Sequence, residues 1–128
     1  MQPTTITGVR TIGVKVSDQD AATQFYVDAL GFEKRLDARI SPTMRWIEVA
    51  PRGANTSIAL NLNDGDPGLA SDTGVRFTVP DAEAEHEAMK QRGVSIGAVL
   101  RVNGVPPMFT FDDPDGNRFY VVEESRQP

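Results

Sequence analysis

Residues 9–32 read VRTIGVKVSDQDAATQFYVDALGF, an alternating segment followed directly by a helical one. In the first part apolar side chains recur at every second residue, which is typical of a half-buried strand. In the second part they recur at every third or fourth residue, which is typical of an amphipathic helix. Asp18 can cap the start of that helix and Gly31 can end it. We therefore predict a strand over Val9–Val16 and a helix over Gln19–Leu30.

Three shorter segments with strand-like patterns follow this pair. They cover Glu33–Arg39, Arg45–Val49 and Ser57–Asn61, and Pro51–Asn55 forms a turn before the last of them. A polar segment rich in glycine and proline then extends over residues 64–72 and is predicted to be a linker.

The same order of patterns then begins again. Gly74–Val79 alternates like the first strand, and a helix is predicted from Asp81 to Gln91 with Gly93 at its end. Further strands are predicted near Val94–Val102, Pro107–Phe111 and Arg118–Glu123, with the turn Asp113-Pro114-Asp115-Gly116-Asn117 before the last.

The two halves match in order and in the positions of their turns. Val16-Ser17-Asp18 corresponds to Val79-Pro80-Asp81, and Gly31 corresponds to Gly93, at a repeat of about 63 residues. Each half is thus one βαβββ unit, and the fold class is α+β. We expect a single domain over residues 1–128, made of module 8–63 and module 73–124.

Composition limits the functions that are possible. Hydrophobic residues make up 39% of the chain and the net charge is −5, so a globular core is expected and attraction to nucleic acid is not. There is no cysteine to form a disulfide or a thiolate metal site. The N-terminus carries no signal pattern and no stretch is long enough to span a bilayer, so a soluble cytoplasmic protein is the expectation.

One face of the predicted sheet carries small, polar and aromatic side chains where a solvated face would carry mainly charges. If helices cover the outer face, this inner face lines a concavity, where small ligands bind. Aligning the halves puts Trp46 opposite Phe109 and Glu48 opposite Phe111. We expect Trp46, Phe109 and Tyr120 in the cleft wall, whereas Phe111 fits the core equally well. Arg76 and Arg118 could meet an anionic or carbonyl group, or form ion pairs with Glu48 or a neighbouring acid.

Three features together resemble the vicinal oxygen chelate superfamily, which includes glyoxalase I, bleomycin resistance proteins and extradiol dioxygenases. They are the βαβββ duplication, the Phe25-Tyr26 to Leu30-Gly31-Phe32 helix end, and the Asp113–Asn117 turn. The resemblance covers about residues 8 to 124. It implies a U-shaped mixed sheet with a cleft inside and helices outside, and it leaves the reaction open.

Metal-dependent members present a ligand from the first and the last strand of each module. The corresponding positions here are Thr11, Ala59, Gly74 and Tyr120. Alanine and glycine offer no side-chain ligand, threonine is weak, and protonated tyrosine is poor at neutral pH. The resemblance therefore implies no metal at this site, and we expect no cofactor. These four positions are instead expected to contact a ligand.

Other chemistry-bearing residues favour structural roles. His86, the only histidine, lies on the second predicted helix and is expected on a solvated face. Asp112, Asp113 and Asp115 are explained by turn chemistry better than by a calcium site.

Three functions remain open. The first is metal-free binding of a small, partly aromatic molecule, for sequestration or sensing as in the bleomycin resistance branch. The second is an enzyme without the family's metal, with Tyr120 as acid or polariser, Glu48 or Lys15 as base and Arg76 as oxyanion partner. The third, a metal-dependent lyase, isomerase or dioxygenase with relocated ligands, is the least favoured.

The resemblance also implies a homodimer with a cleft made or closed across subunits. Whether both modules of one cleft come from one chain is not decided by the sequence. Besides a second copy, we expect a small-molecule ligand as partner, and neither nucleic acid nor a membrane.

Overall fold

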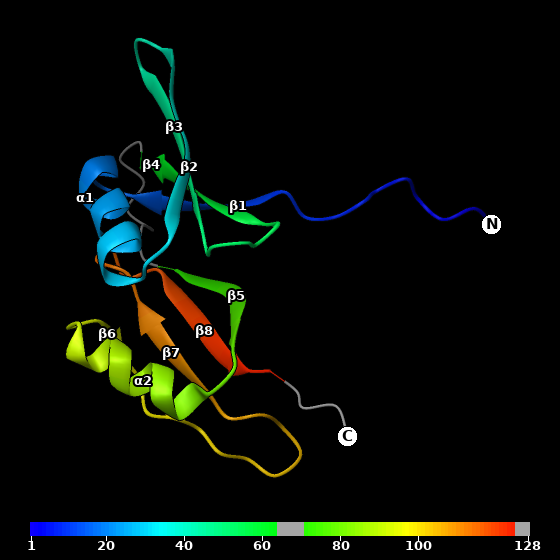
Figure 1. Cartoon of the computed structure of the whole chain (residues 1–128). Helices are drawn as coiled ribbons and strands as arrows, with labels where there is room; N and C mark the ends of the chain where they lie inside the picture. The colour runs from blue at the N-terminus through cyan, green and yellow to red at the C-terminus, as the bar shows by residue number, and fades with distance from the viewer. Residues whose placement is uncertain (64–70, 125–128) are drawn as a thin grey trace.

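The computed structural model describes residues 1–63 and 71–124 (Figure 1). The first half contains β1 (Thr11–Val16), α1 (Gln19–Gln24), η1 (Phe25–Ala29), β2 (Glu33–Ser41), β3 (Met44–Ala50) and β4 (Ser57–Leu62). The second half contains β5 (Asp72–Val79), α2 (Ala82–Gln91), β6 (Ser95–Ile96), β7 (Met108–Asp112) and β8 (Arg118–Glu123). Residues 64–70 of the predicted linker lie outside the described residues, and β5 begins at the linker's last residue.

Each half forms one four-stranded mixed sheet with the same topology. The strand orders are β1-β4-β3-β2 in the first sheet and β5-β8-β7-β6 in the second. In both, the first strand pairs in parallel with the last, and the other pairs are antiparallel. The predicted α+β class with two βαβββ units is therefore confirmed.

The predicted caps set the bounds of the helices. Asp18 accepts a hydrogen bond from the backbone N–H of Ala21 at 3.0 Å, and Asp81 does the same for Ala84 at 3.1 Å. Gly31 and Gly93 have φ of 73° and 78°, the left-handed conformation that ends a helix at low cost for glycine. In the described part of the chain, no helix is long and apolar enough to cross a membrane.

The first helix changes its hydrogen-bonding pattern halfway. Gln19–Gln24 is α-helical, whereas Phe25–Ala29 is a π-helix in which the Leu30 N–H bonds to the Phe25 carbonyl at 3.3 Å. The wider turn contains the Phe25-Tyr26 pair of the sequence motif. Such π-turns occur often at sites under functional or packing demand.

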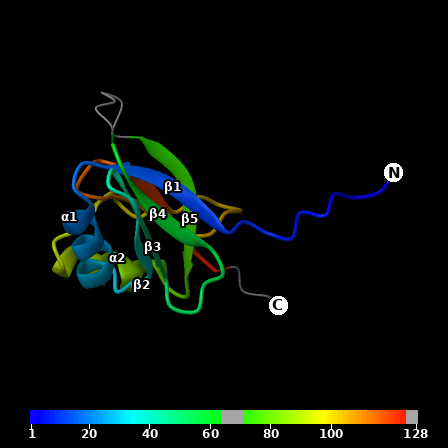
Figure 2. The ribbon, with the colours of Figure 1, turned by 90° about the horizontal axis from the view of Figure 1, so that it is seen from above.

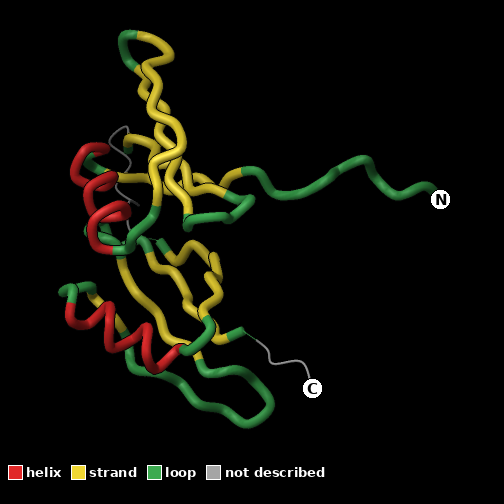
Figure 3. The backbone as a smooth tube through the Cα atoms, in the orientation of Figure 1, coloured by secondary structure: helices red, strands yellow, loops and turns green. Residues whose placement is uncertain are grey.

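Two strands are shorter in the structure than predicted, whereas β2, β3, β4 and β5 are each longer by one or two residues. The segment Val94–Val102 forms only the short β6 and an isolated bridge between Leu100 and Met108. Beyond Ile96 the chain is a loop drawn in green in Figure 3, which contains glycines and the Pro106-Pro107 pair. The first strand begins at Thr11; the N-terminal segment extends away from the body (Figure 1), whereas the Val9 and Arg10 carbonyls accept hydrogen bonds from Thr56 and Ser57.

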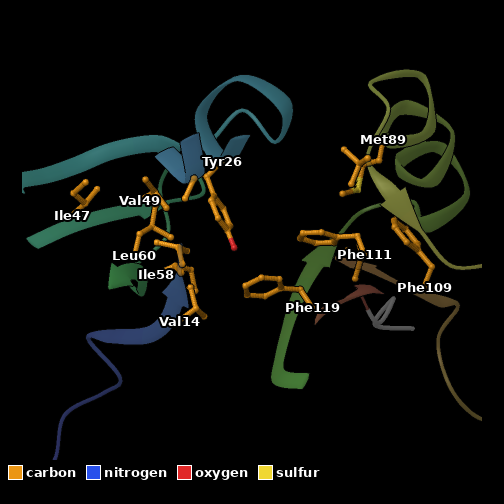
Figure 4. Close-up of a cluster of buried hydrophobic side chains, with 14 of the residues drawn as sticks. Val14, Tyr26, Ile47, Val49, Ile58, Leu60, Met89, Phe109, Phe111 and Phe119 are labelled. Atoms are coloured by element: carbon orange, nitrogen blue, oxygen red, sulfur yellow. The ribbon is translucent and has the colours of Figure 1, made fainter. Parts of the chain in front are cut away.

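The helices lie on the same side of the molecule in two perpendicular views (Figures 1 and 2). Both sheets turn an apolar face inward, and these faces meet in one hydrophobic core. Figure 4 shows Val14 and Leu60 from the first sheet with Phe111 and Phe119 from the second. Tyr26 reaches from η1 to Phe119, with ring centroids 6.1 Å apart and an edge-to-face arrangement.

Candidate functional site

Each sheet also has a face turned away from the shared core. On the first sheet, Ile47, Val49 and Ile58 point into the core, so the residues that alternate with them lie on the opposite face. The register pairs Thr11 with Ser57 and Glu48 with Ala59. We call the set Thr11, Trp46, Glu48, Ser57 and Ala59 the Trp46 face.

Glu48 is the centre of a hydrogen-bond network on the Trp46 face. Its side chain lies between neighbouring strands and the residue is only 6% exposed. One carboxylate oxygen accepts from the Ser57 hydroxyl at 2.7 Å, and the other accepts from the Trp46 indole N–H at 2.8 Å. The Ser57 hydroxyl oxygen also lies 2.9 Å from the Thr11 hydroxyl oxygen, and the Thr11 hydroxyl donates to the Ser57 carbonyl at 3.2 Å. Trp46, Glu48, Ser57 and Thr11 are thereby held in one arrangement.

The electrostatics of this network make Glu48 an anion. Donation from Ser57, then from Trp46, lowers the pKa of the Glu48 carboxyl, and desolvation only partly opposes them. A carboxylate with a lowered pKa is a weak proton acceptor, so the geometry does not favour Glu48 as a general base. It favours Glu48 as a fixed negative charge.

A cavity of about 320 Å³ opens beside Glu48. It is lined by Arg10, Arg35, Leu36, Glu48, Asn55 and Ser57. All of these residues belong to the first half of the chain. The second half of the chain therefore contributes no residue to the lining of this cavity.

The outward face of the second sheet carries Arg76, Thr110, Arg118 and Tyr120, which we call the Tyr120 face. Register pairs Arg76 and Thr110 with Tyr120 on either side. The guanidinium of Arg76 lies 4.6 Å from the centre of the Tyr120 ring, within range of a cation–π contact. Arg118 binds both carboxylate oxygens of Asp112, at 2.9 and 3.2 Å. Of the two roles expected for Arg118, the structure shows the ion pair with a neighbouring acid, Asp112.

The Tyr120 hydroxyl is already occupied within the chain. It donates to Asp72, and this hydrogen bond raises the pKa of the Tyr120 phenol above its ordinary value. The phenol remains protonated at neutral pH, with its proton directed at Asp72. The arrangement gives Tyr120 an apolar ring surface to offer and disfavours it as a general acid.

The four positions that carry metal ligands in the family do not form a donor set here. The Thr11 hydroxyl donates to the Ser57 carbonyl, and Ala59 presents only a methyl group. Gly74 lies in an irregular part of β5, between the pairs Asp72–Arg118 and Arg76–Tyr120, where its N–H bonds to Asp72. Tyr120 holds its proton. Within residues 1–63 and 71–124, no group of three or more His, Asp or Glu side chains is placed to hold a metal ion.

Phe109 does not lie on the Tyr120 face, so its expected place in the cleft wall is wrong. It is 1% exposed and packs edge-to-face on His86 of α2, at 5.1 Å between ring centres. Phe111 is in the core as well. Ala59 of β4 and Tyr120 of β8 occupy equivalent positions in the two halves. Glu48 pairs with Ala59 and Thr110 pairs with Tyr120, so Glu48 corresponds to Thr110 in the sheet register. The sequence alignment was displaced by one residue, which moves every side chain to the other face.

His86 and the aspartates near the last turn have structural roles. His86 is half-buried, and its Nε2 lies 2.8 Å from the Gly97 carbonyl oxygen, so the expected solvated position is wrong. Asp113 accepts hydrogen bonds from the backbone N–H groups of Asp115 and Asn117, both at 2.9 Å, as the turn pattern predicts.

Three residues that the sequence did not single out contribute to these faces. Ser57 and Arg10 complete the Glu48 network, and Asp72 holds Tyr120. Serine and arginine at strand ends carry no distinctive signal. Asp72 lies in what composition marks as a linker.

A larger cavity, of about 840 Å³, is lined by residues of both halves. Its walls include the apolar residues Ile12, Ile58, Val75 and Phe77, the turn at Pro51, and two of the expected site residues, Gly74 and Arg76. The cavity is mainly apolar and is separate from the Trp46 face.

Comparison with known proteins adds to this geometry. A family model described as Glyoxalase/Bleomycin resistance protein/Dioxygenase superfamily matches residues 8–121. Bacillus subtilis YetH is 30% identical over 118 residues, covering 90% of this chain and 97% of the relative. A superfamily member from Sphaerobacter thermophilus DSM 20745 is 35% identical, with a TM-score of 0.87, and the match covers 93% of this chain and 98% of that one. TnmS3 of Streptomyces sp. CB03234, described as an antibiotic binding protein, is 31% identical with a TM-score of 0.81, over 96% and 100% of the two chains.

Proposed function

The chain belongs to the Glyoxalase/Bleomycin resistance protein/Dioxygenase superfamily, and on this basis we propose that it binds a small, partly aromatic molecule without a metal ion. The proposal rests on the residues that occupy the four positions where metal-dependent members of the family carry their metal ligands. Thr11, Ala59, Gly74 and Tyr120 offer hydrogen bonds and apolar surface, and no set of donors for a divalent cation. We propose that the same positions contact the ligand.

The ligand class follows from the side chains around these positions. Trp46 and Tyr120 each combine a ring surface with a polar group that is held in place. Arg76 adds a planar cation above the Tyr120 ring. Flat ring systems with a few polar substituents match this surface better than aliphatic metabolites or large polymers. The description of TnmS3 as an antibiotic binding protein supports sequestration of such a compound.

We further propose that two chains build each site. The Trp46 and Tyr120 faces both turn away from the core that the two sheets share. A homodimer could set the Trp46 face of one chain against the Tyr120 face of its partner. In this proposal the domain comprises module 8–63 and module 73–124, and each cleft takes one module from each chain.

Catalysis is less well supported. The proposed base, Glu48, has a lowered pKa, and the proposed acid, Tyr120, has a raised pKa with its proton engaged by Asp72. Both shifts move the pKa further from neutral pH, whereas general acid–base catalysis works best when the pKa values of the acid and the base lie near the working pH. Lys15 lies further along β1 on the same side as Thr11.

The test combines metal analysis with binding at a defined reporter. Protein purified without chelators is measured for bound divalent metal, and we expect less than stoichiometric amounts. Trp46 is the only tryptophan, so its indole N–H resonance reports directly on the Trp46 face. We expect saturable shifts of this resonance with 2-naphthylmethanol as a neutral aromatic probe. Stoichiometric metal would contradict the metal-free proposal.

Two other results would redirect the proposal. Binding with no change at Trp46 would place the ligand in the larger cavity, beside Ile12 and Phe77. Chemical conversion of a bound compound by metal-free protein would favour the enzyme. Both are read from the same titration, followed by analysis of the compound that is recovered.

A further inference from the structure

Glu48 is nearly buried and ionised, yet its ion pair within residues 1–63 and 71–124 is with a weakly held, exposed side chain. Arg10 approaches one Glu48 oxygen at 3.4 Å, close to the limit for a hydrogen bond, and the Arg10 side chain is 75% exposed. Arg10 belongs to the exposed segment before β1. A buried charge gains most from a close, desolvated partner, and this contact is neither close nor desolvated.

Glu48 also retains capacity to accept a hydrogen bond. A carboxylate offers about four lone-pair directions. Oε2 accepts from Trp46 and Arg10, whereas Oε1 accepts from the Ser57 hydroxyl. Within the described residues these are the donors to the carboxylate, which therefore has room for one more, and Glu48 lines the cavity of about 320 Å³.

The other cation that lines this cavity is engaged elsewhere. Arg35 donates to Glu33 at 3.0 Å and to the Pro51 carbonyl at 3.0 Å, and it also bonds to the Ala54 carbonyl. Its guanidinium is therefore committed to the β3–β4 turn and to its own strand. Leu36 and Asn55 complete the lining without adding charge.

From these contacts we propose that the cavity beside Glu48 selects ligands that carry a protonated amine, which displaces Arg10 from the carboxylate. The inference rests on the proposed binding function and specifies its ligand class. The ring system of the ligand lies on Trp46, whose indole N–H is fixed to Glu48 and keeps the ring beside the charge. The ammonium donates to Glu48 in a charge-assisted hydrogen bond. Glu48 is thus a specificity-determining residue.

The experiment compares three probes that share one ring system and differ in charge. They are 2-naphthylmethylamine, 2-naphthylmethanol and 2-naphthoate, which are cationic, neutral and anionic at pH 7. Affinities are measured by calorimetry and by the Trp46 indole N–H resonance, for the full chain at fixed concentration and salt. We expect the amine to bind roughly tenfold more tightly than the alcohol, with the carboxylate weakest, as a hydrogen bond to a charged group allows.

Three variants make the test specific. Glu48→Gln keeps the shape and should abolish the preference for the amine, so that the ratio of the amine and alcohol affinities falls to about one. Arg10→Ala removes the competing cation and should tighten amine binding several-fold, an increase that a purely structural role for Arg10 would not produce. Glu87→Gln removes one negative charge from α2 and should leave all three affinities unchanged. Glu87 accepts a hydrogen bond from Gln91 on the same helix and does not line the cavity beside Glu48.

Failure of the inference can be told apart from failure of the proposed function. Equal binding of all three probes, or an amine preference that survives Glu48→Gln, overturns the inference and leaves aromatic binding intact. Weaker amine binding by Arg10→Ala overturns it too, even if Glu48→Gln does not fold. If none of the probes binds, both the inference and the proposed site at Trp46 fail.

Discussion

The Tyr26 hydroxyl donates a hydrogen bond of 2.8 Å to the Asp113 carboxylate, and this contact joins the two sequence motifs by which the family is recognised. Tyr26 comes from the π-helical end of the first helix, and Asp113 from the turn before the last strand. Both are buried, and Asn117 donates to the same carboxylate at 2.9 Å and to the Lys15 carbonyl at 2.8 Å. Burial, followed by Asp113, raises the pKa of Tyr26, so it stays a donor. The turn therefore fixes how the two halves pack.

Removing this hydroxyl should destabilise the protein. Tyr26→Phe keeps the ring contacts with Phe119 and leaves the buried Asp113 carboxylate without one of its donors. We expect a loss of about 1.5–3 kcal/mol in the free energy of unfolding, typical of a buried hydrogen bond to a charged group. Urea denaturation at one protein concentration measures it.

Tyr120→Phe is the matched control, because it removes a hydroxyl that also donates to an aspartate. Asp72 is exposed, so water can replace the lost donor. The loss should be below about 0.5 kcal/mol. Equal losses in the two variants would show that the Tyr26–Asp113 bond has no special part in joining the halves.

Phe109 should matter for stability and not for binding. Phe109→Leu leaves part of the space beside His86 and Phe111 unfilled, and we expect a cost of about 1–2 kcal/mol. Calorimetric affinity for 2-naphthylmethanol, taken per folded molecule, should stay unchanged. Trp46→Phe should lower the affinity, and it should also cost some stability because the Glu48 carboxylate loses the indole N–H donor. A large affinity loss in Phe109→Leu would return Phe109 to the cleft wall.

The Glu48 network should make stability depend on pH in a defined direction. The folded-state pKa of Glu48 lies below the ordinary value of about 4.5. The unfolded chain therefore binds more protons in that range, and stability rises with pH. The contribution of Glu48 is complete above its ordinary pKa and is lost as the pH falls through the lowered value.

Denaturation between pH 7 and pH 3 tests this direction against Glu48→Gln. The wild-type protein should lose more stability than the variant on acidification below the ordinary carboxyl range. Other carboxylates with lowered pKa, such as Asp37 and Asp72, titrate in both proteins and cancel in the comparison. Parallel curves for the two proteins would contradict the assigned network.

Chelation should leave the protein unaffected. Because Thr11, Ala59, Gly74 and Tyr120 supply no metal donor set, dialysis against EDTA should change neither the unfolding midpoint nor the affinity for the naphthyl probes. A loss of binding that added zinc or manganese restores would indicate ligands other than those four.

Most of the fold could be predicted from the sequence because the signals for its helices and strands are local. Alternation, capping residues such as Asp18 and Asp81, and terminal glycines each act within a few residues, and the repeat then fixed the order of the elements. The short β6 was overestimated because apolar residues in a loop imitate a strand. Nothing local distinguishes Val99 and Leu100 from strand residues.

The site was less predictable because it depends on register between strands. A shift of one residue in aligning the halves was enough to place Phe109 on the wrong face. Ser57 and Arg10 reach Glu48 only through pairing across strands, and Asp72 reaches Tyr120 over a separation that composition does not reveal. The division of the expected residues into two outward faces follows from packing between the halves, which no local pattern encodes.

We propose that each binding site combines the Trp46 face of one chain with the Tyr120 face of another. Mixing two inactive variants, Trp46→Ala and Tyr120→Ala, tests it most directly. In a mixed dimer one site carries both substitutions and the other carries neither, so after subunit exchange calorimetry should recover about a quarter of the wild-type sites for 2-naphthylmethylamine, with wild-type affinity. No recovery, although exchange of differently tagged chains is complete, would contradict a site built by two chains.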